Sequence, residues 1–309
     1  MRFYSGFVDN FKKAVKVMNE ADPIGEKKLN EVRNEIVSAL TPIYGDREAK
    51  AMVGIIFENL KGWNRVDMAL KADQLISPFI IHQIDSVVRR LLDHEPIQYI
   101  FGNAWFYGMR LKVTSDTLIP RPETAELVDY IVKDYREKSD QGVLDLCTGT
   151  GCIAIALARN LPFSKVTAVD VSAKALAVAQ DNAISLHANV NFLKTDILKD
   201  NSGLIAGQYD VIVSNPPYIA EKEKSDMDRN VLAYEPHLAL FVPDDDPLVF
   251  YNAIFRISLG HLTDTGKVYC EINPVYAAEV RDLAVRKGFG NVDLVRDSYG
   301  KERFLIAWK

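Results

Sequence analysis

Four residues near the middle of the chain have the chemistry to hold a planar amino group. They are Asn215, Pro216, Pro217 and Tyr218, and they follow the apolar run 209–214, which is typical of a buried strand. Each proline fixes φ near about −65° and lacks an N–H, so the turn is rigid and its carbonyls can face a ligand. This arrangement suits an amide or a nucleobase whose nitrogen attacks an electrophile, although Pro-Pro also ends strands for purely structural reasons.

A glycine-containing loop at 145–151 is the second candidate site. It lies where a predicted strand at 143–146 passes into a predicted helix at 153–159, and glycine lets a backbone approach a ligand closely. In open α/β sheets, ligands bind at this end of the strands, where the strand order reverses. The residues that we expect at a cofactor here are Asp145, Cys147, Thr148, Gly149, Thr150 and Gly151.

Acidic residues end the next two predicted strands. Asp170 follows the strand at 165–169, where a carboxylate can hydrogen-bond both hydroxyls of a ribose. Asp196 follows the strand at 190–193, where it could bind an adenine amino group. We expect both acids at the same cofactor, together with the residues that follow them, Val171 and Ile197, and with Asn215.

The spacing of the glycines discriminates among cofactors. A dinucleotide fingerprint has a third glycine, but Cys152, Ile153 and Ala154 follow Gly151. A phosphate loop needs Gly-Lys-Ser/Thr, which is absent too. The loop followed by two strand-ending acids is similar to the S-adenosylmethionine site of class I methyltransferases. We therefore expect S-adenosylmethionine as cofactor and S-adenosylhomocysteine as its product, and we disfavour a dinucleotide-dependent oxidoreductase.

Composition and charge narrow the class of protein. The chain has 309 residues, a net charge of −5 and only three cysteines. An odd number of cysteines without a CxxC pair argues against a disulfide framework or a zinc site and favours a reducing cytosol. Proteins that clamp nucleic acid usually have a basic face, and no apolar run approaches the roughly 18 residues of a membrane span. We expect a cytoplasmic protein that has no metal site and makes no direct contact with nucleic acid or membrane.

The elements that position these residues divide near residue 95. Residues 1–95 have helical periodicity, breaks at Gly45 and Gly62, and a helix at 78–92 that begins with proline. Acidic and basic side chains are balanced there, so we predict a helical bundle that docks a large substrate. The first twenty-five residues are polar, and we interpret them as a loosely attached helix.

The rest of the chain predicts a linker and an α/β domain. Residues 96–121, starting with an extended segment at 98–102, predict a β-hairpin linker because they are rich in aromatics and punctuated by glycine. Strand and helix patterns alternate over 122–309, which implies a mostly parallel sheet with helices on both faces. The segments 291–296 and 303–308 predict a closing antiparallel pair, so the last strand runs antiparallel.

Taken together, these residues resemble the HemK/PrmC-type family, which methylates the side-chain amide of a glutamine in peptide chain release factors. The similarity runs from about residue 28 to the end. Besides the turn at 215–218, it rests on Glu-Pro-Ile-Gln-Tyr-Ile-Phe-Gly at 95–102, Leu-Ile-Pro-Arg-Pro-Glu-Thr at 118–124, Tyr-Glu-Pro at 234–236 with Ala239 and Leu240, and Asp-Ser-Tyr-Gly at 297–300 with Arg303. The Pro-Arg-Pro-Glu-Thr segment discriminates best, because other methyltransferases with an Asn-Pro-Pro-Tyr turn generally lack it.

The sequence departs from the family pattern at four places. Cys147 stands where many members have glycine, and its small size keeps the loop plausible. Ala125 replaces a frequent glutamate, 241–246 replaces a glycine-rich turn, and Asn273-Pro274 replaces a glycine and a glutamine. None of these changes touches the amide-binding turn.

The resemblance implies a class I, Rossmann-like methyltransferase that acts on release factors, and we expect it to be a monomer. The catalytic residues would be Asn215, Pro216 and Tyr218, and the substrate site would add Pro217, Arg121, Glu123 and Thr124. In our hypothesis the Asn215 side-chain oxygen and the Pro216 carbonyl accept the two amide protons, while Tyr218 packs against the amide. Arg121, Glu123 and Thr124 have an equally plausible role as a structural link.

Two other functions remain open from the sequence. An amino-directed nucleic-acid methyltransferase, acting on adenine N6 in DNA or guanine N2 in ribosomal RNA, shares the turn and would receive a flipped base. The acidic charge and the Pro-Arg-Pro-Glu-Thr segment argue against it. A non-catalytic binding module of the same fold is the second alternative, and the intact residues Asp145, Asp170, Asp196 and Asn215 argue against that.

Overall fold

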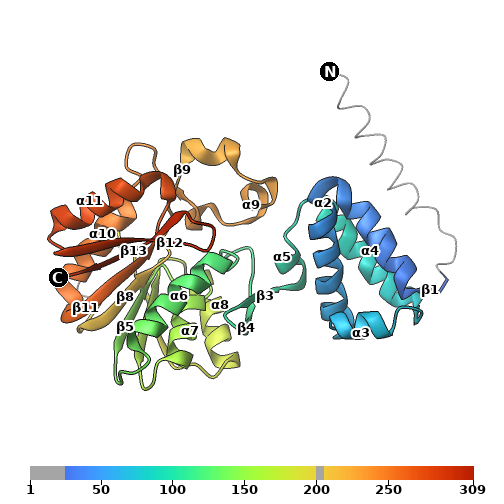
Figure 1. The fold of residues 1–309 in the computed structure, drawn as a ribbon, viewed down its shortest axis with the longest axis horizontal. Helices are drawn as coiled ribbons and strands as arrows, with labels where there is room; N and C mark the ends of the chain where they lie inside the picture. The colour runs from blue at the N-terminus through green and yellow to red at the C-terminus, as the bar shows by residue number, and fades with distance from the viewer. Residues whose placement is uncertain (1–24, 200–204) are drawn as a thin grey trace. The chain divides into compact units, whose positions relative to one another are not determined.

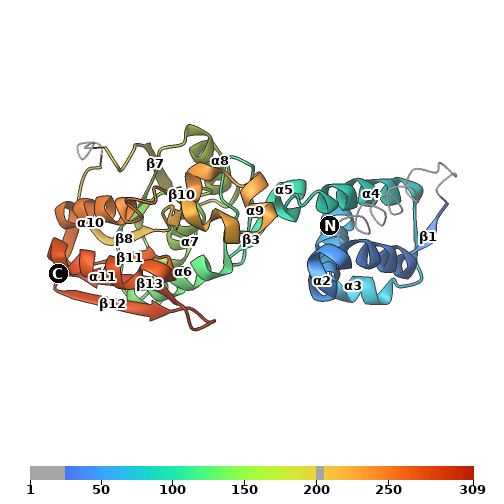
Figure 2. The same cartoon turned by 90° about the horizontal axis from the view of Figure 1, so that it is seen from above.

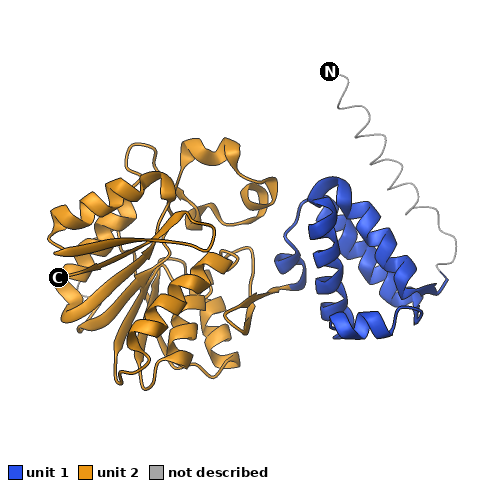
Figure 3. Ribbon diagram, in the orientation of Figure 1, with its two compact units in different colours: residues 1–101 blue, residues 102–309 orange. Residues whose placement is uncertain are grey.

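The computed structural model describes residues 25–199 and 205–309. The described residues up to 101 and those from 102 onward form two compact units, shown in blue and orange in Figure 3. The loosely attached helix predicted for the first twenty-five residues lies almost wholly outside the described residues. Within the described residues, no helix combines the length and the apolar character that crossing a membrane requires.

The first unit is built on two long helices. Helix α2 (Leu29–Lys61) packs against α4 (Pro78–Leu92), and the short helix α3 (Arg65–Leu70) lies between them in the chain. The two-residue strands β1 (Lys27–Lys28) and β2 (Leu75–Ile76) pair antiparallel. Apolar side chains one helical turn apart form the core, among them Leu29, Val32, Ile36, Leu40, Ile84, Val88 and Leu91. The predicted helical character of this region is confirmed.

Glycines end or bend the helices where the sequence predicts. Gly45 has φ 77° and ψ 161°, a conformation that kinks α2 and that side chains other than hydrogen resist. Gly62 is left-handed after α2, and its N–H bonds the Glu58 carbonyl at 2.9 Å. Helix α4 begins at Pro78, as predicted.

The extended segment predicted at 98–102 is wrong, because the structure has a helix there, α5 (Ile97–Phe101). The Pro96 carbonyl accepts from Tyr99 N at 2.9 Å and from Ile100 N at 3.1 Å, and Ile97 is buried in the core of the first unit. Tertiary packing therefore overrides the strand preference of the aromatic and β-branched residues. The predicted hairpin is confirmed but shorter, with β3 (Asn103–Phe106) antiparallel to β4 (Met109–Lys112).

The second unit is a seven-stranded sheet covered on both faces (Figures 1 and 2). Its strands are β5 (Gly142–Leu146), β6 (Lys165–Asp170), β7 (Val190–Lys194), β8 (Tyr209–Ser214), β11 (Leu262–Glu271), β12 (Asn291–Arg296) and β13 (Glu302–Trp308). They lie in the order β12-β13-β11-β8-β5-β6-β7. Within the described residues, β13 runs antiparallel to both of its neighbours, β11 and β12, and the other strand pairs of the sheet are parallel. The predicted mostly parallel sheet with an antiparallel last strand is confirmed.

Helices divide between the two faces of this sheet and form separate cores. The core on one face contains residues of α6 (Pro122–Tyr135), α7 (Cys152–Asn160) and α8 (Ala173–Ser185). The other contains residues of α10 (Val249–His261) and α11 (Ala277–Lys287). Both strand faces are buried, which explains why the central strands are continuous apolar runs in the sequence.

The strand order reverses between β5 and β8. From β5 the chain adds β6 and β7 on one side, then returns to place β8 on the other. Leu146 and Ser214 are register partners at the ends of β5 and β8, so the glycine loop and the Asn-Pro-Pro-Tyr turn start side by side. A covering segment, which we define as 219–248, follows the turn. Its elements are β9 (Ile219–Ala220), η2 (Glu221–Asp226), α9 (Arg229–Tyr234), η3 (His237–Ala239) and β10 (Phe241–Val242).

The kink in α2 gives a paired test of backbone conformation. An added Cβ meets nothing within 4 Å at either Gly45 or Gly54, so the two sites of α2 differ mainly in backbone angles. We expect Gly45→Ala to destabilise α2 by about 1–3 kcal/mol, and Gly54→Ala to stabilise it by up to about 1 kcal/mol. Hydrogen–deuterium exchange of peptides from 29–61 in the full chain measures both. Equal protection in the two variants would refute the assigned role of Gly45.

Candidate active site

A cavity opens at the carboxyl ends of the parallel strands in the second unit. It is lined by most of the predicted site residues, namely Arg121, Thr124, Cys147, Thr148, Gly149, Thr150, Asp170, Val171, Asp196, Ile197, Asn215 and Pro217. Apolar residues that the sequence did not single out complete the wall, including Leu198, Leu238 and Phe250. Five predicted residues are placed behind or beside this lining: Asp145, Gly151, Pro216, Tyr218 and Glu123.

The glycine loop adopts left-handed backbone at three positions. Cys147, Gly149 and Gly151 have φ of 63°, 55° and 78°. A Cβ on Gly151 would lie 3.1 Å from the side chains of Ile155 and Ala179, so glycine is needed there for close packing of α7 and α8. The sequence argument for Cys147 rested on its size. Backbone conformation is a second constraint at Cys147, because left-handed residues other than glycine are strained.

Asp145 supports the loop from below. Its side chain is fully buried, and its Oδ2 accepts from Thr148 Oγ1 at 2.6 Å and from Ala154 N at 3.2 Å. Among the described residues, none bonds its Oδ1. Burial raises the pKa of this carboxyl to about 7, while its bonds to Thr148 and Ala154 oppose the rise. Asp145 therefore holds the loop in shape, while its buried Oδ1 has no partner among the described residues.

Asp170 and Asp196 present carboxylate oxygens to the cavity. Asp170 Oδ2 accepts from Gly149 N and its Oδ1 from Ser172 N, both at 2.9 Å. Burial raises the pKa of Asp170, although these backbone donors favour its charged form. Asp196 Oδ1 accepts from Leu198 N at 3.1 Å. Each carboxylate oxygen can accept more than one bond, so both acids keep capacity for a ligand's hydroxyl or amino groups.

The Asn215 amide is held in one orientation. Its Nδ2 donates to Thr124 Oγ1 at 3.1 Å, which leaves Oδ1 as the accepting end for a ligand. Thr124 comes from the start of α6, ninety-one positions earlier in the chain, and lines the same cavity. The Pro-Arg-Pro-Glu-Thr segment and the Asn-Pro-Pro-Tyr turn are therefore parts of one site.

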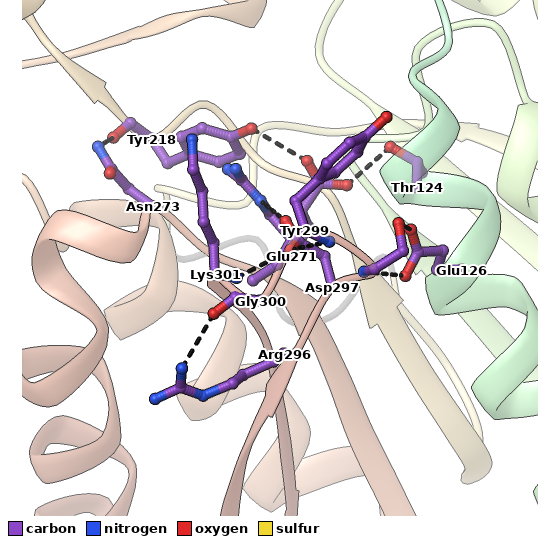
Figure 4. Close-up of polar contacts among 12 residues, drawn as sticks. Thr124, Glu126, Tyr218, Glu271, Asn273, Arg296, Asp297, Tyr299, Gly300 and Lys301 are labelled. Atoms are coloured by element: carbon purple, nitrogen blue, oxygen red, sulfur yellow. Dashed lines mark hydrogen bonds and ion pairs between the residues drawn. The ribbon is translucent and has the colours of Figure 1, made fainter.

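The Tyr218 hydroxyl is hydrogen-bonded to a buried carboxylate. The hydroxyl donates to Glu271 Oε1 at 3.0 Å, as Figure 4 shows, and Asn273 Nδ2 donates to the Tyr218 carbonyl at 3.2 Å. Burial and the neighbouring Glu271 carboxylate raise the pKa of the Tyr218 phenol well above its usual value. The phenol therefore keeps its proton at neutral pH, and Tyr218 is no general base.

The covering segment is fastened to the Pro-Arg-Pro-Glu-Thr segment through a buried acid. Glu235 is 4 % exposed, and it pairs with the Arg121 guanidinium and accepts from Ile119 N at 3.1 Å. Pro236 and Leu238, next along the segment, line the cavity. Arg121 therefore links separate elements and also lines the cavity.

The Asp-Ser-Tyr-Gly motif forms the turn between β12 and β13. Asp297 Oδ1 accepts from Tyr299 N at 3.0 Å and from Lys301 N at 2.9 Å, and its Oδ2 accepts from Arg303 Nε at 3.2 Å. Figure 4 shows this turn beside Glu126 of α6, which accepts from Ser298. Hydrogen bonds within the turn therefore account for the Asp-Ser-Tyr-Gly motif.

Sequence reasoning missed Glu271 and the bonding role of Asn273. Glu271 is the last residue of β11 and is only 1 % exposed. The three residues before it, Val268, Tyr269 and Cys270, are apolar and buried. An acid at the end of an apolar strand is the sequence signal that could identify Glu271, because a buried carboxylate needs hydrogen-bonding or charged partners. The expectation that no departure from the family pattern touches the amide-binding turn is wrong, because Asn273 Nδ2 bonds the Tyr218 carbonyl of that turn.

Fold and site together define a methyltransferase. A model of the methyltransferase small domain matches residues 124–234, and one of the PrmC N-terminal domain matches residues 31–102. The catalytic domain of hMettl16, solved in complex with MAT2A 3′UTR hairpin 1, superposes with a TM-score of 0.51 at 17% identity over 77% of this chain and 83% of that one. At this low identity the likeness shows the fold alone.

Sequence relatives narrow the class to a family. A release factor glutamine methyltransferase of Flavobacterium psychrophilum is 40% identical over 90% of this chain and 98% of its own length. One of Bacteroides thetaiotaomicron is 42% identical over 90% of this chain and 99% of its own. The chain belongs to the release factor glutamine methyltransferase family, and the resemblance inferred from its motifs is confirmed.

The left-handed Cys147 gives a test by substitution. Glycine would remove about 1–2 kcal/mol of strain but would add roughly 0.5–1 kcal/mol of unfolded-chain entropy. We therefore expect Cys147→Gly to raise the free energy of unfolding by at most about 1.5 kcal/mol. The β-branched Cys147→Val should lower it by more than about 2 kcal/mol. Urea unfolding of the full chain measures both.

Cys270→Val serves as the matched control, because Cys270 is buried in β11 and is absent from the left-handed residues. We expect it to lower the free energy of unfolding by less than about 1.5 kcal/mol. An equal loss at positions 147 and 270 would show that side-chain volume, and not backbone conformation, governs the loop.

Proposed function

We propose that this chain transfers a methyl group from S-adenosylmethionine to the side-chain amide nitrogen of the glutamine in the Gly-Gly-Gln loop of peptide chain release factors. One observation carries the proposal: Asn215, whose amide nitrogen is bonded to Thr124 Oγ1, lines the same cavity as Asp170 and Asp196. Relatives that match nearly the whole chain carry the name of this activity.

The residues of the cavity fit S-adenosylmethionine. Asp170 offers carboxylate oxygens to the ribose hydroxyls, and Asp196 offers one to the adenine amino group. Ile197, Leu198 and Phe250 supply apolar surface for the adenine ring. The unpaired, fully buried Asp145 Oδ1 favours a positive or hydrogen-bonding group near the loop. When bound, the cofactor would supply a methyl group activated by its positively charged sulfur.

The turn supplies orientation. A glutamine amide nitrogen is a poor nucleophile because its lone pair is delocalised into the carbonyl. In the proposed mechanism, Asn215 Oδ1 and the Pro216 carbonyl each accept a hydrogen bond from one amide N–H, which draws electron density onto nitrogen. As the nitrogen forms its bond to the methyl group, the bond from that methyl group to sulfur would break, and the methylated nitrogen would release one of its two protons to solvent. Holding the lone pair toward the methyl group can remove several kcal/mol of the barrier, up to roughly 7–11 in favourable model reactions.

Tyr218 completes the amide site without acting as a base. Its phenol stays protonated and bonded to Glu271, so its ring is held in place beside the turn. We propose that the ring packs on the flat amide and excludes water. Leu238, which is 62% exposed and lines the cavity, would add a second apolar contact for the glutamine side chain.

We assign a separate task to each part of the chain. Residues 1–95 would dock the release factor, 96–121 would link, and 122–309 would bind the cofactor and perform the transfer. Two matches support this division, because the PrmC N-terminal domain and the methyltransferase small domain fall on different sides of the hairpin.

A methyl-transfer assay tests the proposed substrate. Purified chain and labelled S-adenosylmethionine are mixed with a release factor, with its Gln→Ala variant at the Gly-Gly-Gln loop, with duplex DNA and with ribosomal RNA. We expect label only in the intact release factor, on the glutamine amide. Label in nucleic acid would establish the amino-directed alternative, and cofactor binding without any transfer would favour a binding module.

Two substitutions separate transfer from cofactor binding. We expect Asn215→Ala to remove most turnover and to leave S-adenosylmethionine affinity nearly unchanged, because the amide contacts the substrate. Asp170→Ala should mainly weaken cofactor affinity, because it removes the proposed ribose acceptor. Calorimetric titration with S-adenosylmethionine and the labelled assay measure the two effects. Lost affinity with retained turnover in the Asn215 variant would refute its role.

A further inference from the structure

Glu271 is a buried carboxylate with a hydroxyl on each oxygen. Its Oε1 accepts from the Tyr218 hydroxyl at 3.0 Å, and its Oε2 accepts from Thr124 Oγ1 at 2.7 Å. Figure 4 shows Tyr218 and Thr124 on opposite sides of this carboxylate. The Tyr251 hydroxyl donates to the Glu271 backbone carbonyl at 3.1 Å, which ties the end of β11 to α10. Glu271 does not line the cavity.

We propose that Glu271 is the positioning residue of the amide site. It orients the Tyr218 side chain directly and the Asn215 side-chain amide through the Thr124 hydroxyl. The inference rests on the function proposed above and deepens it. It assigns Glu271 no contact with substrate or cofactor.

The number of hydrogen-bonding protons at this site explains why a carboxylate is needed at position 271. An ionised carboxylate only accepts hydrogen bonds, so each hydroxyl must direct its single hydrogen at Glu271. Thr124 Oγ1 then has only lone pairs to offer, and it can receive Nδ2 but not Oδ1 of Asn215. One anion thereby fixes two hydroxyl rotors and one amide orientation, all within reach of the substrate.

The buried charge has a compensating neighbour on the next strand. Burial raises the pKa of Glu271, while the hydroxyls of Thr124 and Tyr218 and the charge of Arg303 on β13 favour its ionised form. Glu123 on α6 opposes it as a like charge. Arg303 is in turn held by Asp297 at 3.2 Å, so the Asp-Ser-Tyr-Gly turn places the positive charge that Glu271 needs.

Near-isosteric variants test the chain of bonds. Glu271→Gln replaces a carboxylate oxygen, which only accepts hydrogen bonds, by an amide nitrogen, which donates them. Thr124→Val removes the hydroxyl that bonds both Glu271 and Asn215, at nearly constant side-chain volume. We expect each to lower kcat for release factor methylation by about tenfold to a hundredfold. The KM for release factor and the affinity for S-adenosylmethionine should change by less than about threefold. Thr124→Ser should restore most of kcat, because it keeps the hydroxyl.

A double substitution shows whether Glu271 acts through Asn215. In the Asn215→Ala background, we expect Glu271→Gln to add at most the smaller loss that Tyr218 accounts for, measured separately with Tyr218→Phe. Asp129→Asn is the matched control, because Asp129 is a carboxylate on α6 that accepts from the Tyr107 hydroxyl at 2.8 Å, outside this network. It should leave kcat unchanged. Additive losses in the double variant would overturn the relay.

A measurement on the protein alone separates this inference from the proposed function. The Asn215 side-chain amide signal can be identified in a ¹⁵N NMR spectrum by its absence from Asn215→Ala. We expect its protons to exchange slowly with solvent in the wild type and at least about tenfold faster in Thr124→Val and Glu271→Gln. If wild type does not methylate release factor, the proposed function fails, and the exchange rates still decide the positioning. Unchanged exchange in both variants would refute it.

Discussion

The parallel pairing of β5 with β8 is the constraint on which the site depends. Leu144 and Leu146 face Ile212 and Ser214 in register, and all four are fully buried. Ser214 Oγ also donates to the Leu146 carbonyl at 2.7 Å, at the point where both strands end. Because parallel strands finish at the same edge, this pairing brings a loop and a turn that are more than sixty residues apart in the chain to one cavity.

Polar groups buried around that edge give the site its rigidity. Asp145 holds Thr148, Asp170 holds Gly149, and Glu271 holds Thr124 and Tyr218. In a low-dielectric interior these bonds are strong, and leaving any partner unmatched would cost about 1–3 kcal/mol. The same acids therefore stabilise the fold locally and orient the groups that face cofactor and substrate, so stability and function are coupled at these positions.

Contacts between segments that are distant in the chain explain several of the family motifs. Thr124 meets Asn215, Arg121 meets Glu235, and Arg303 meets Asp297 beside the Glu271 carboxylate. The first two bonds each join two motifs that lie far apart in the chain, and Arg303 and Asp297 belong to one motif. A change in one of them should therefore be felt at the amide site even where the altered side chain touches no ligand.

The sequence by itself determined the alternation of strands and helices, the glycine breaks, the cavity residues after β5, β6 and β8, and the family. These features follow from local periodicity and turn chemistry. Only the tertiary structure turned residues 98–101 into a helix, through the burial of Ile97, and placed Asp145 beneath the loop. It alone decided the left-handed Cys147 and the bonds of Glu271, because partners brought together by strand order have no signature in the spacing of residues along the chain.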